Sequence, residues 1–158
     1  MNLPELKIGK LVAQVPIIQG GMAIRLSTAP LAAAVANEGG IGLIAASGMG
    51  LDELRKEIRM ARELTGGKGI IGINAMVAAR QFLDLITTAA EEGIDLIVAG
   101  AGFSRDIFAV GKKYGVEVVP IVSSARLAQT AEKLGASAVV VEGTEAGGHL
   151  GTQQSIKE

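Results

Sequence analysis

The amino-acid sequence predicts an α/β fold with a parallel β-sheet. Short apolar segments recur at nearly regular intervals, and segments with helical spacing lie between them. The apolar segments are continuous rather than alternating, which is typical of parallel strands covered on both faces. The predicted strands are Val15–Gln19, Ile41–Ala45, Gly69–Asn74, Asp95–Ala99, Glu117–Ile121 and Ala138–Glu142. Regular alternation of strands and helices favours a parallel sheet.

The segments between the strands are predicted to be helices. The clearest is Leu51–Leu64, where apolar residues recur every three or four positions and charged residues fill the outer face, as in an amphipathic helix. The other predicted helices are Thr28–Glu38, Ala79–Glu92, Ser104–Tyr114 and Ser124–Leu134. Several helices stop at a glycine, as expected for C-terminal caps, at Gly39, Gly93, Gly115 and Gly135.

The chain length is compatible with two architectures. A chain of 158 residues, 49% of them hydrophobic, can form one sizeable core, so we expect a single domain over residues 1–158. Periodicity does not separate an open doubly wound sheet from a closed (β/α)8 barrel. Eight units need at least ~200 residues, whereas this sequence reaches a sixth strand. Residues Ser155–Glu158 match the capping box that begins a helix, which favours a barrel truncated after about six strands.

Composition excludes several function classes. The 15 basic and 16 acidic residues give a net charge of -1 and do not cluster, so no surface for nucleic acid or an anionic membrane is expected. With no cysteine and one histidine, we expect no metal site. The sequence contains no apolar stretch of the length that suggests a membrane span and no recognisable secretory signal, so a cytoplasmic location is expected.

Glycine residues collect after the predicted strands. The sequence has 22 glycines, and the strands are followed by Gly20-Gly21-Met22, Ser47-Gly48, Gly100-Ala101-Gly102 and the long segment Gly143–Thr152. In parallel α/β folds these turns share one face, where ligands bind. Glycine also lets a ligand approach the backbone closely. The pattern therefore predicts a ligand site on this face.

Four side chains near these turns are candidates for the site, each with an alternative role. His149 can act as a general base near neutral pH, or it is structural. Asn74 contacts a ligand or caps the following helix. Glu142 ends an apolar strand, so its carboxylate either binds loop amides or faces a ligand. Met22 is expected to pack.

The motifs in these turns resemble those of a known family. Pro16–Ala23, Gly39–Gly42, Ile73-Asn74, Gly100–Gly102 and above all Glu142–Gly151, with its E-A-G-G-H sequence, resemble the FMN-dependent nitronate monooxygenases, formerly called 2-nitropropane dioxygenases. The flavin enoyl-acyl-carrier-protein reductases of bacterial fatty-acid synthesis share this signature. The resemblance implies a (β/α)8 TIM barrel, of which this chain matches roughly the N-terminal half.

The resemblance also implies roles for individual residues. His149 corresponds to the histidine that takes the proton α to the nitro group. The implied FMN contacts are Gly20, Gly21, Met22, Asn74, Glu142, Gly147 and Gly148. Glutamate at position 142 is similar to the enoyl reductases, since many nitronate monooxygenases have glutamine there. In contrast, Ser104–Asp106 and Val119–Arg126 look more like bacterial nitronate monooxygenases.

Three functions are therefore open. The leading hypothesis is oxidation of small alkyl nitronates by molecular oxygen with FMN. The alternative is an NAD(P)H-dependent enoyl-acyl-carrier-protein reductase. The third is a non-catalytic barrel fragment that forms a homodimer or pairs with the missing half-barrel. In the family, phosphate-binding loops follow the last strands, so we expect at most weak FMN binding by these 158 residues alone.

Overall fold

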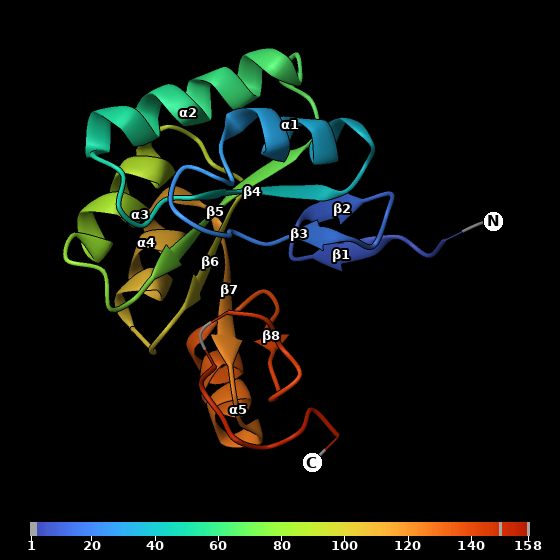
Figure 1. Cartoon of the computed structure of the whole chain (residues 1–158), viewed down its shortest axis with the longest axis vertical. Helices are drawn as coiled ribbons and strands as arrows, with labels where there is room; N and C mark the ends of the chain where they lie inside the picture. Colours follow the sequence, from blue (N-terminus) through green and yellow to red (C-terminus); the bar gives the residue numbers. More distant parts are fainter. Residues whose placement is uncertain (1–2, 149, 158) are drawn as a thin grey trace.

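The computed structural model describes residues 3–148 and 150–157. Its centre is a six-stranded sheet in which every strand is parallel to its neighbours, and the sheet curls into a half-barrel (Figure 1). The strands are β3 (Ile18–Gln19), β4 (Ile41–Ala45), β5 (Ile70–Met76), β6 (Leu96–Gly100), β7 (Glu117–Val122) and β8 (Val140–Val141). The helices are α1 (Ala29–Asn37), α2 (Leu51–Leu64), α3 (Phe82–Glu91), α4 (Asp106–Tyr114) and α5 (Ala125–Leu134).

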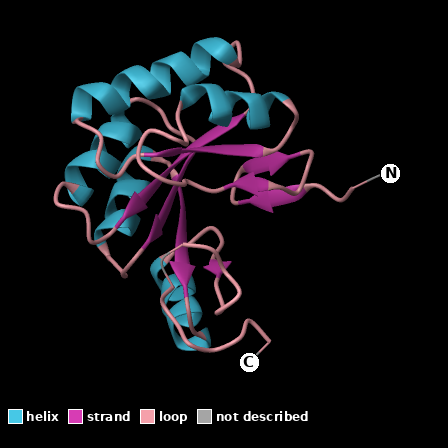
Figure 2. Cartoon of the chain, viewed as in Figure 1, coloured by secondary structure: helices cyan, strands magenta, loops and turns pink. Residues whose placement is uncertain are grey.

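The strand order decides between the two predicted architectures. A doubly wound sheet reverses its strand order at a switch point, whereas here the spatial order β3-β4-β5-β6-β7-β8 follows the chain. Helices α1 to α4 lie along the outer side of the curled sheet (Figure 2). The prediction of a partial TIM barrel is therefore confirmed. No described helix has the length and apolarity needed to cross a membrane.

Two apolar clusters cover the two faces of the sheet. Alternate residues of each strand point to opposite faces, so Ile44, Ile73 and Ile97 pack under the helices. Leu43 and Leu96 belong to the second cluster, on the concave inner face. This two-sided burial explains why the predicted strands are continuous apolar segments.

An N-terminal hairpin was not predicted. Strands β1 (Leu6–Ile8) and β2 (Leu11–Ala13) pair in antiparallel orientation, and Ile8 and Ala13 belong to the inner cluster. The backbone N–H of Lys10, in the turn, donates to the carboxylate of Glu117 at the start of β7 (3.0 Å). The hairpin therefore covers the inner apolar face from the end where the strands begin.

Small residues bring the first helix onto the sheet. A Cβ atom at Gly42 would lie 1.9 Å from the backbone oxygen of Ala32 in α1, so only glycine fits there. Likewise, a Cβ atom at Gly72 would lie 2.5 Å from Leu96 and 2.6 Å from Leu43. These strand glycines serve packing and are not part of a ligand site.

Some predicted boundaries were wrong. β3 begins at Ile18 rather than Val15, because Pro16 has no N–H to donate to the ladder. Helix α3 begins at Phe82 rather than Ala79, because residues 77–81 form a loop.

The glycines predicted at the C-terminal ends of helices have positive φ angles, as such caps do: Gly39 +86°, Gly93 +74°, Gly115 +69° and Gly135 +96°. At the predicted start of a final helix, the Ser155 hydroxyl accepts the backbone N–H of Lys157 (3.4 Å).

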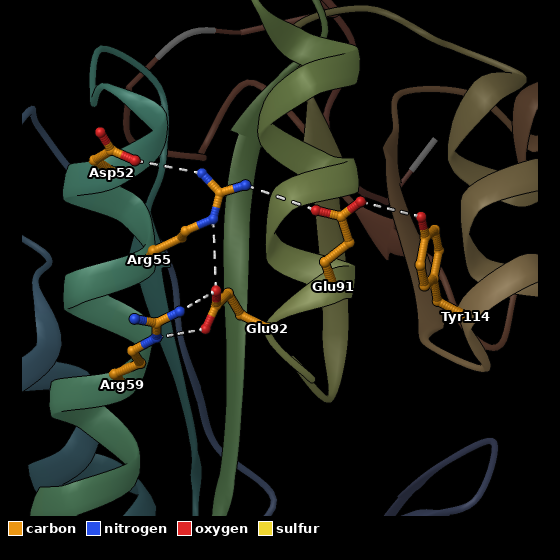
Figure 3. A network of polar contacts seen from close by, with 6 residues as sticks. All are labelled: Asp52, Arg55, Arg59, Glu91, Glu92 and Tyr114. Atoms are coloured by element: carbon orange, nitrogen blue, oxygen red, sulfur yellow. Dashed lines mark hydrogen bonds and ion pairs between the residues drawn. The ribbon is translucent and has the colours of Figure 1, made fainter.

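Ion pairs join the outer surfaces of α2 and α3 (Figure 3). The guanidinium of Arg59 forms two hydrogen bonds with the carboxylate of Glu92 (2.7 and 2.8 Å). Arg55 also approaches Glu92 (3.5 Å) and reaches Glu91 (3.7 Å). Tyr114 at the end of α4 donates a hydrogen bond to Glu91 (3.4 Å). Three consecutive helices are therefore linked by one polar network.

We expect this network to make stability depend on pH. The hydrogen bonds from Arg59 lower the pKa of Glu92, so the ionised carboxylate favours the folded state above its unfolded pKa of about 4.3, and this contribution is lost as the pH falls through the folded pKa. Glu92→Gln should therefore lower the free energy of unfolding by less than about 1 kcal/mol at pH 7, with no difference from the parent at low pH. Urea unfolding between pH 3 and 7 measures this. Glu63→Gln on α2 is the control, and equal effects of both variants would contradict the assignment.

Candidate functional site

The loops that follow the strands meet at one edge of the sheet. Because all six strands are parallel, their carboxyl ends share this edge. The Gly20–Met22 loop follows β3, Asn74 lies near the end of β5, and Glu142 directly follows β8. The candidate residues therefore lie on the same face, as the sequence predicted.

Asn74 fastens the glycine loop that follows β3. Its side-chain oxygen accepts the backbone N–H of Gly21 (3.2 Å), and a Cβ atom at Gly21 would lie 2.5 Å from the Cβ of Asn74. The N-cap of the following helix is Gln81 rather than Asn74, so the capping alternative is wrong. The structure thus brings together two of the predicted site residues and shows why glycine is needed at position 21.

Two serines that were not among the predicted site residues hold the same face. The hydroxyl of Ser27 is fully buried and accepts the N–H of Met22 (3.0 Å). The hydroxyl of Ser47 accepts the N–H of Met76 (2.8 Å), which joins the ends of β4 and β5. The sequence offered one signal for these two residues, a serine in a segment that follows a strand. This signal is weak, because serine is also common in ordinary turns.

Gln19 lengthens the short strand β3 with its side chain. Its amide oxygen accepts the N–H of Leu43 (3.3 Å), and its amide nitrogen donates to the carbonyl of Leu43 (3.2 Å). The side chain therefore continues the β3–β4 ladder beyond the last backbone pair. Met22 at the end of this loop is 52% exposed, so the expectation that it packs is wrong.

Backbone strain is also found at this edge. Among the described residues, the non-glycine positions with positive φ are Arg25 (+58°) and Ala101 (+52°), and both lie in loops that follow strands. Arg25 is held by Glu53 through two hydrogen bonds (2.9 and 3.2 Å), and these lower the pKa of Glu53. Strained residues of this kind cluster at functional sites.

Carboxylates organise the loop that follows β8. Glu142 accepts the N–H of Gly151 (2.9 Å), so it binds a loop amide, as one of the two sequence alternatives stated. Glu145 accepts hydrogen bonds from the Ser155 hydroxyl and from the N–H of Ile156 (3.2 Å). These bonds lower the pKa of Glu145. No group of three metal-ligand side chains is found among residues 3–148 and 150–157.

Three glycines have no explanation in packing or conformation. Most glycines of the chain have a positive φ angle or a neighbour that would clash with a Cβ atom. Gly20, Gly50 and Gly147 have neither, since a Cβ atom at each would meet no atom within 4 Å. All three follow strands, so the space beside them is on the candidate face. A flat cofactor that touches the backbone fits this arrangement.

The remaining predicted residues are not gathered into one cluster. Gly147 and Gly148 follow β8, whereas Gly20 follows β3, and these are the two edge strands of the sheet. Gly148 has a φ of +89° and open space around it. The predicted catalytic residue, His149, lies outside the described residues.

We expect Gly21→Ala to destabilise the fold. The added methyl group would press on Asn74 and strain the loop, at a cost of about 1–3 kcal/mol in the free energy of unfolding. Gly20→Ala, one residue away, meets open space and should leave stability unchanged or slightly higher. Urea unfolding of both variants measures the difference, and equal stability would argue against the Gly21–Asn74 contact.

Comparisons with known proteins identify the family and the fold. A sequence profile described as "Nitronate monooxygenase" matches residues 5–99 and 78–158. FabK from Thermotoga maritima has a solved structure that superposes with a TM-score of 0.82 at 38% identity, over 89% of this chain and 44% of that chain. The likeness therefore includes fold and sequence.

Two curated relatives bear the names of oxidoreductases. A (3aS,4S,5R,7aS)-5-hydroxy-7a-methyl-1-oxo-octahydro-1H-indene-4-carboxyl-CoA dehydrogenase of Mycobacterium tuberculosis is 32% identical over 136 positions, covering 86% of this chain and 38% of that protein. A nitronate monooxygenase of Paraburkholderia phytofirmans is 32% identical over 186 positions, covering 94% and 49%. The chain thus spans less than half the length of each of these relatives. Since the family profile matches nearly the whole chain, this protein belongs to the nitronate monooxygenase family.

Proposed function

We propose that this protein is an FMN-dependent oxidoreductase, with residues 1–158 contributing one FMN-binding unit. The observation that carries the proposal is the pair Gly20 and Gly147, which have no packing or conformational reason to be glycine. Both lie in loops whose motifs resemble the FMN-contacting loops of the family. Glycine at these positions leaves room for a flat ring beside the backbone.

Other residues would shape the FMN site indirectly or at its margin. Asn74 holds the Gly21 amide in place (3.2 Å), and Glu142 holds the Gly151 amide (2.9 Å). Met22 is exposed in the loop after β3 and is available to lie against the flavin ring. A Cβ atom at Gly148, like one at Gly147, would meet no atom within 4 Å. When bound, FMN would supply two-electron chemistry between an organic substrate and a second electron carrier.

The first candidate reaction is oxidation of alkyl nitronates by molecular oxygen. Family membership supports this reaction. In this proposal His149 takes the proton from the carbon next to the nitro group of a neutral nitroalkane, which suits an imidazole near neutral pH. A nitronate anion has already lost that proton, so its oxidation does not need the base.

The second candidate is NAD(P)H-dependent reduction of an enoyl thioester, and the likeness to a relative named as a carboxyl-CoA dehydrogenase supports a thioester substrate. The match to the nitronate monooxygenase extends over more positions than this chain has residues, so that relative carries segments that are absent here. The match to the CoA dehydrogenase needs no such extra positions, since 136 positions account for 86% of the chain. Glu142 is likewise the residue that resembles the enoyl reductases.

We expect Gly20→Ala and Gly147→Ala to weaken FMN binding without loss of stability. Each methyl group would occupy the space proposed for the cofactor, and neither meets protein atoms. Quenching of FMN fluorescence on titration with the protein should show affinities reduced by about tenfold or more, the effect of losing ~1.4 kcal/mol of binding. Thermal unfolding is the control. Unchanged FMN affinity in both variants would contradict the proposal.

We expect His149→Ala to impair turnover of a neutral nitroalkane far more than turnover of the corresponding nitronate. With the protein supplied with FMN, oxygen consumption should fall about 100-fold or more with a neutral nitroalkane and remain near the parent value with its nitronate. An equal loss on both would argue against a proton-transfer role. NAD(P)H oxidation that depends on an added enoyl thioester, without nitronate-dependent oxygen consumption, would identify the second reaction instead.

A further inference from the structure

A recess lies at the same edge of the sheet as the proposed FMN site. A groove of about 510 Å³ opens between the loop that joins β4 to α2 and the loop that joins β5 to α3. Met49 and Leu85 are nearly fully buried (4% and 2% exposed) and provide an apolar base. Gly50 lines one side and Arg80 the other. The groove thus combines an apolar floor with a cationic rim.

Gly50 is the third glycine without a structural reason. It is the N-cap of α2 with φ -72° and ψ 158°, an extended conformation that other residues adopt easily. Serine, aspartate and asparagine cap helices at least as well as glycine. A Cβ atom here would meet nothing within 4 Å. The fold does not require glycine at position 50, whereas a ligand lying in the groove would.

Arg80 provides an anion-binding group at the opposite rim. Its side chain is exposed, and within residues 3–148 and 150–157 no carboxylate forms an ion pair with it. By contrast, the arginines of α2 are all engaged with acidic groups. A guanidinium beside a groove suits the planar, bidentate recognition of a phosphate.

The groove is joined to the proposed FMN site. The Ser47–Met76 hydrogen bond (2.8 Å) joins the β4–α2 loop to the end of β5, from which the other lining loop continues. Met76 is two residues beyond Asn74, and Arg80 follows four residues later. Six residues span at most about 22 Å, so a long, thin ligand anchored at Arg80 can reach the Asn74–Gly21 contact.

We propose that this groove binds the phosphate-bearing pantetheine arm of an acyl thioester. The phosphate is bound by Arg80, the arm passes Gly50 and lies over Met49 and Leu85, and the thioester end reaches Asn74 and Gly21. The assignment rests on thioester reduction as the reaction of the proposed FMN site. The 4′-phosphopantetheine arm fits because it is long, narrow and partly apolar, with one anionic end.

Isothermal titration calorimetry of the protein with 4′-phosphopantetheine, coenzyme A, pantetheine and NADPH tests the proposal without need of FMN. We expect the two phosphate-bearing pantetheine compounds to bind, and Arg80→Gln to weaken both about tenfold. Gly50→Ser should weaken them without lowering the thermal unfolding midpoint. Arg105→Gln, on the next loop along the sheet, is the matched control and should change nothing. Equal affinity for 4′-phosphopantetheine and coenzyme A indicates that the groove recognises their shared phosphopantetheine arm. Tighter binding of coenzyme A indicates that the acyl carrier is coenzyme A, with its nucleotide also recognised.

Other outcomes would overturn the assignment. These are equal effects of Arg80→Gln and Arg105→Gln, pantetheine binding as tightly as 4′-phosphopantetheine, or NADPH displacing coenzyme A with an Arg80-dependent affinity. Unchanged FMN affinity in Gly20→Ala and Gly147→Ala, with Arg80-dependent binding of 4′-phosphopantetheine, refutes the FMN site and leaves the groove standing by itself. Intact FMN binding with no pantetheine binding refutes the groove alone. Failure of the two proposals is thus distinguishable.

Discussion

Parallel pairing of six successive strands is the constraint on which the rest of the structure depends. Because every strand runs in the same direction, each helix must return along the outer face, and each post-strand loop must emerge at the same edge. The outer face then needs close contact between helix and sheet, which Gly42 allows against Ala32. The inner face needs apolar side chains and a cover, which the β1–β2 hairpin provides. The topology of the sheet therefore determines which loops form the candidate site, whatever side chains those loops carry.

Much of this arrangement follows from local sequence, and the exceptions have identifiable causes. Buried parallel strands are continuous apolar segments, so the central strands were predicted within a residue or two. The hairpin was missed because three-residue strands give too few positions for a pattern. β3 was predicted too long, because Pro16 lies in an apolar segment but has no N–H to donate.

The candidate site was predicted in part for a similar reason. Residue type and position after a strand pointed to Asn74 and Glu142, but their partners, Gly21 and Gly151, depend on contacts between separate loops. Ser27 and Ser47 were missed as site residues because a serine in a turn is common, and only their hydrogen bonds to Met22 and Met76 distinguish these two. Counting glycines also could not show which of them serve packing. That distinction required coordinates, because it depends on what a Cβ atom would meet.

The two edges of the site differ in how firmly the protein holds them. Loops at the β3–β5 side are fastened to one another by buried or half-buried side chains and rest on a core with many fully buried residues. At the other side β8 has two residues, α5 buries only Ala131, and the final loop is held mainly by its own carboxylates. Few buried apolar contacts mean a low free energy of local opening. A ligand spanning both sides would therefore meet one preorganised wall and one wall that must be ordered on binding, and the entropy of that ordering would reduce its affinity.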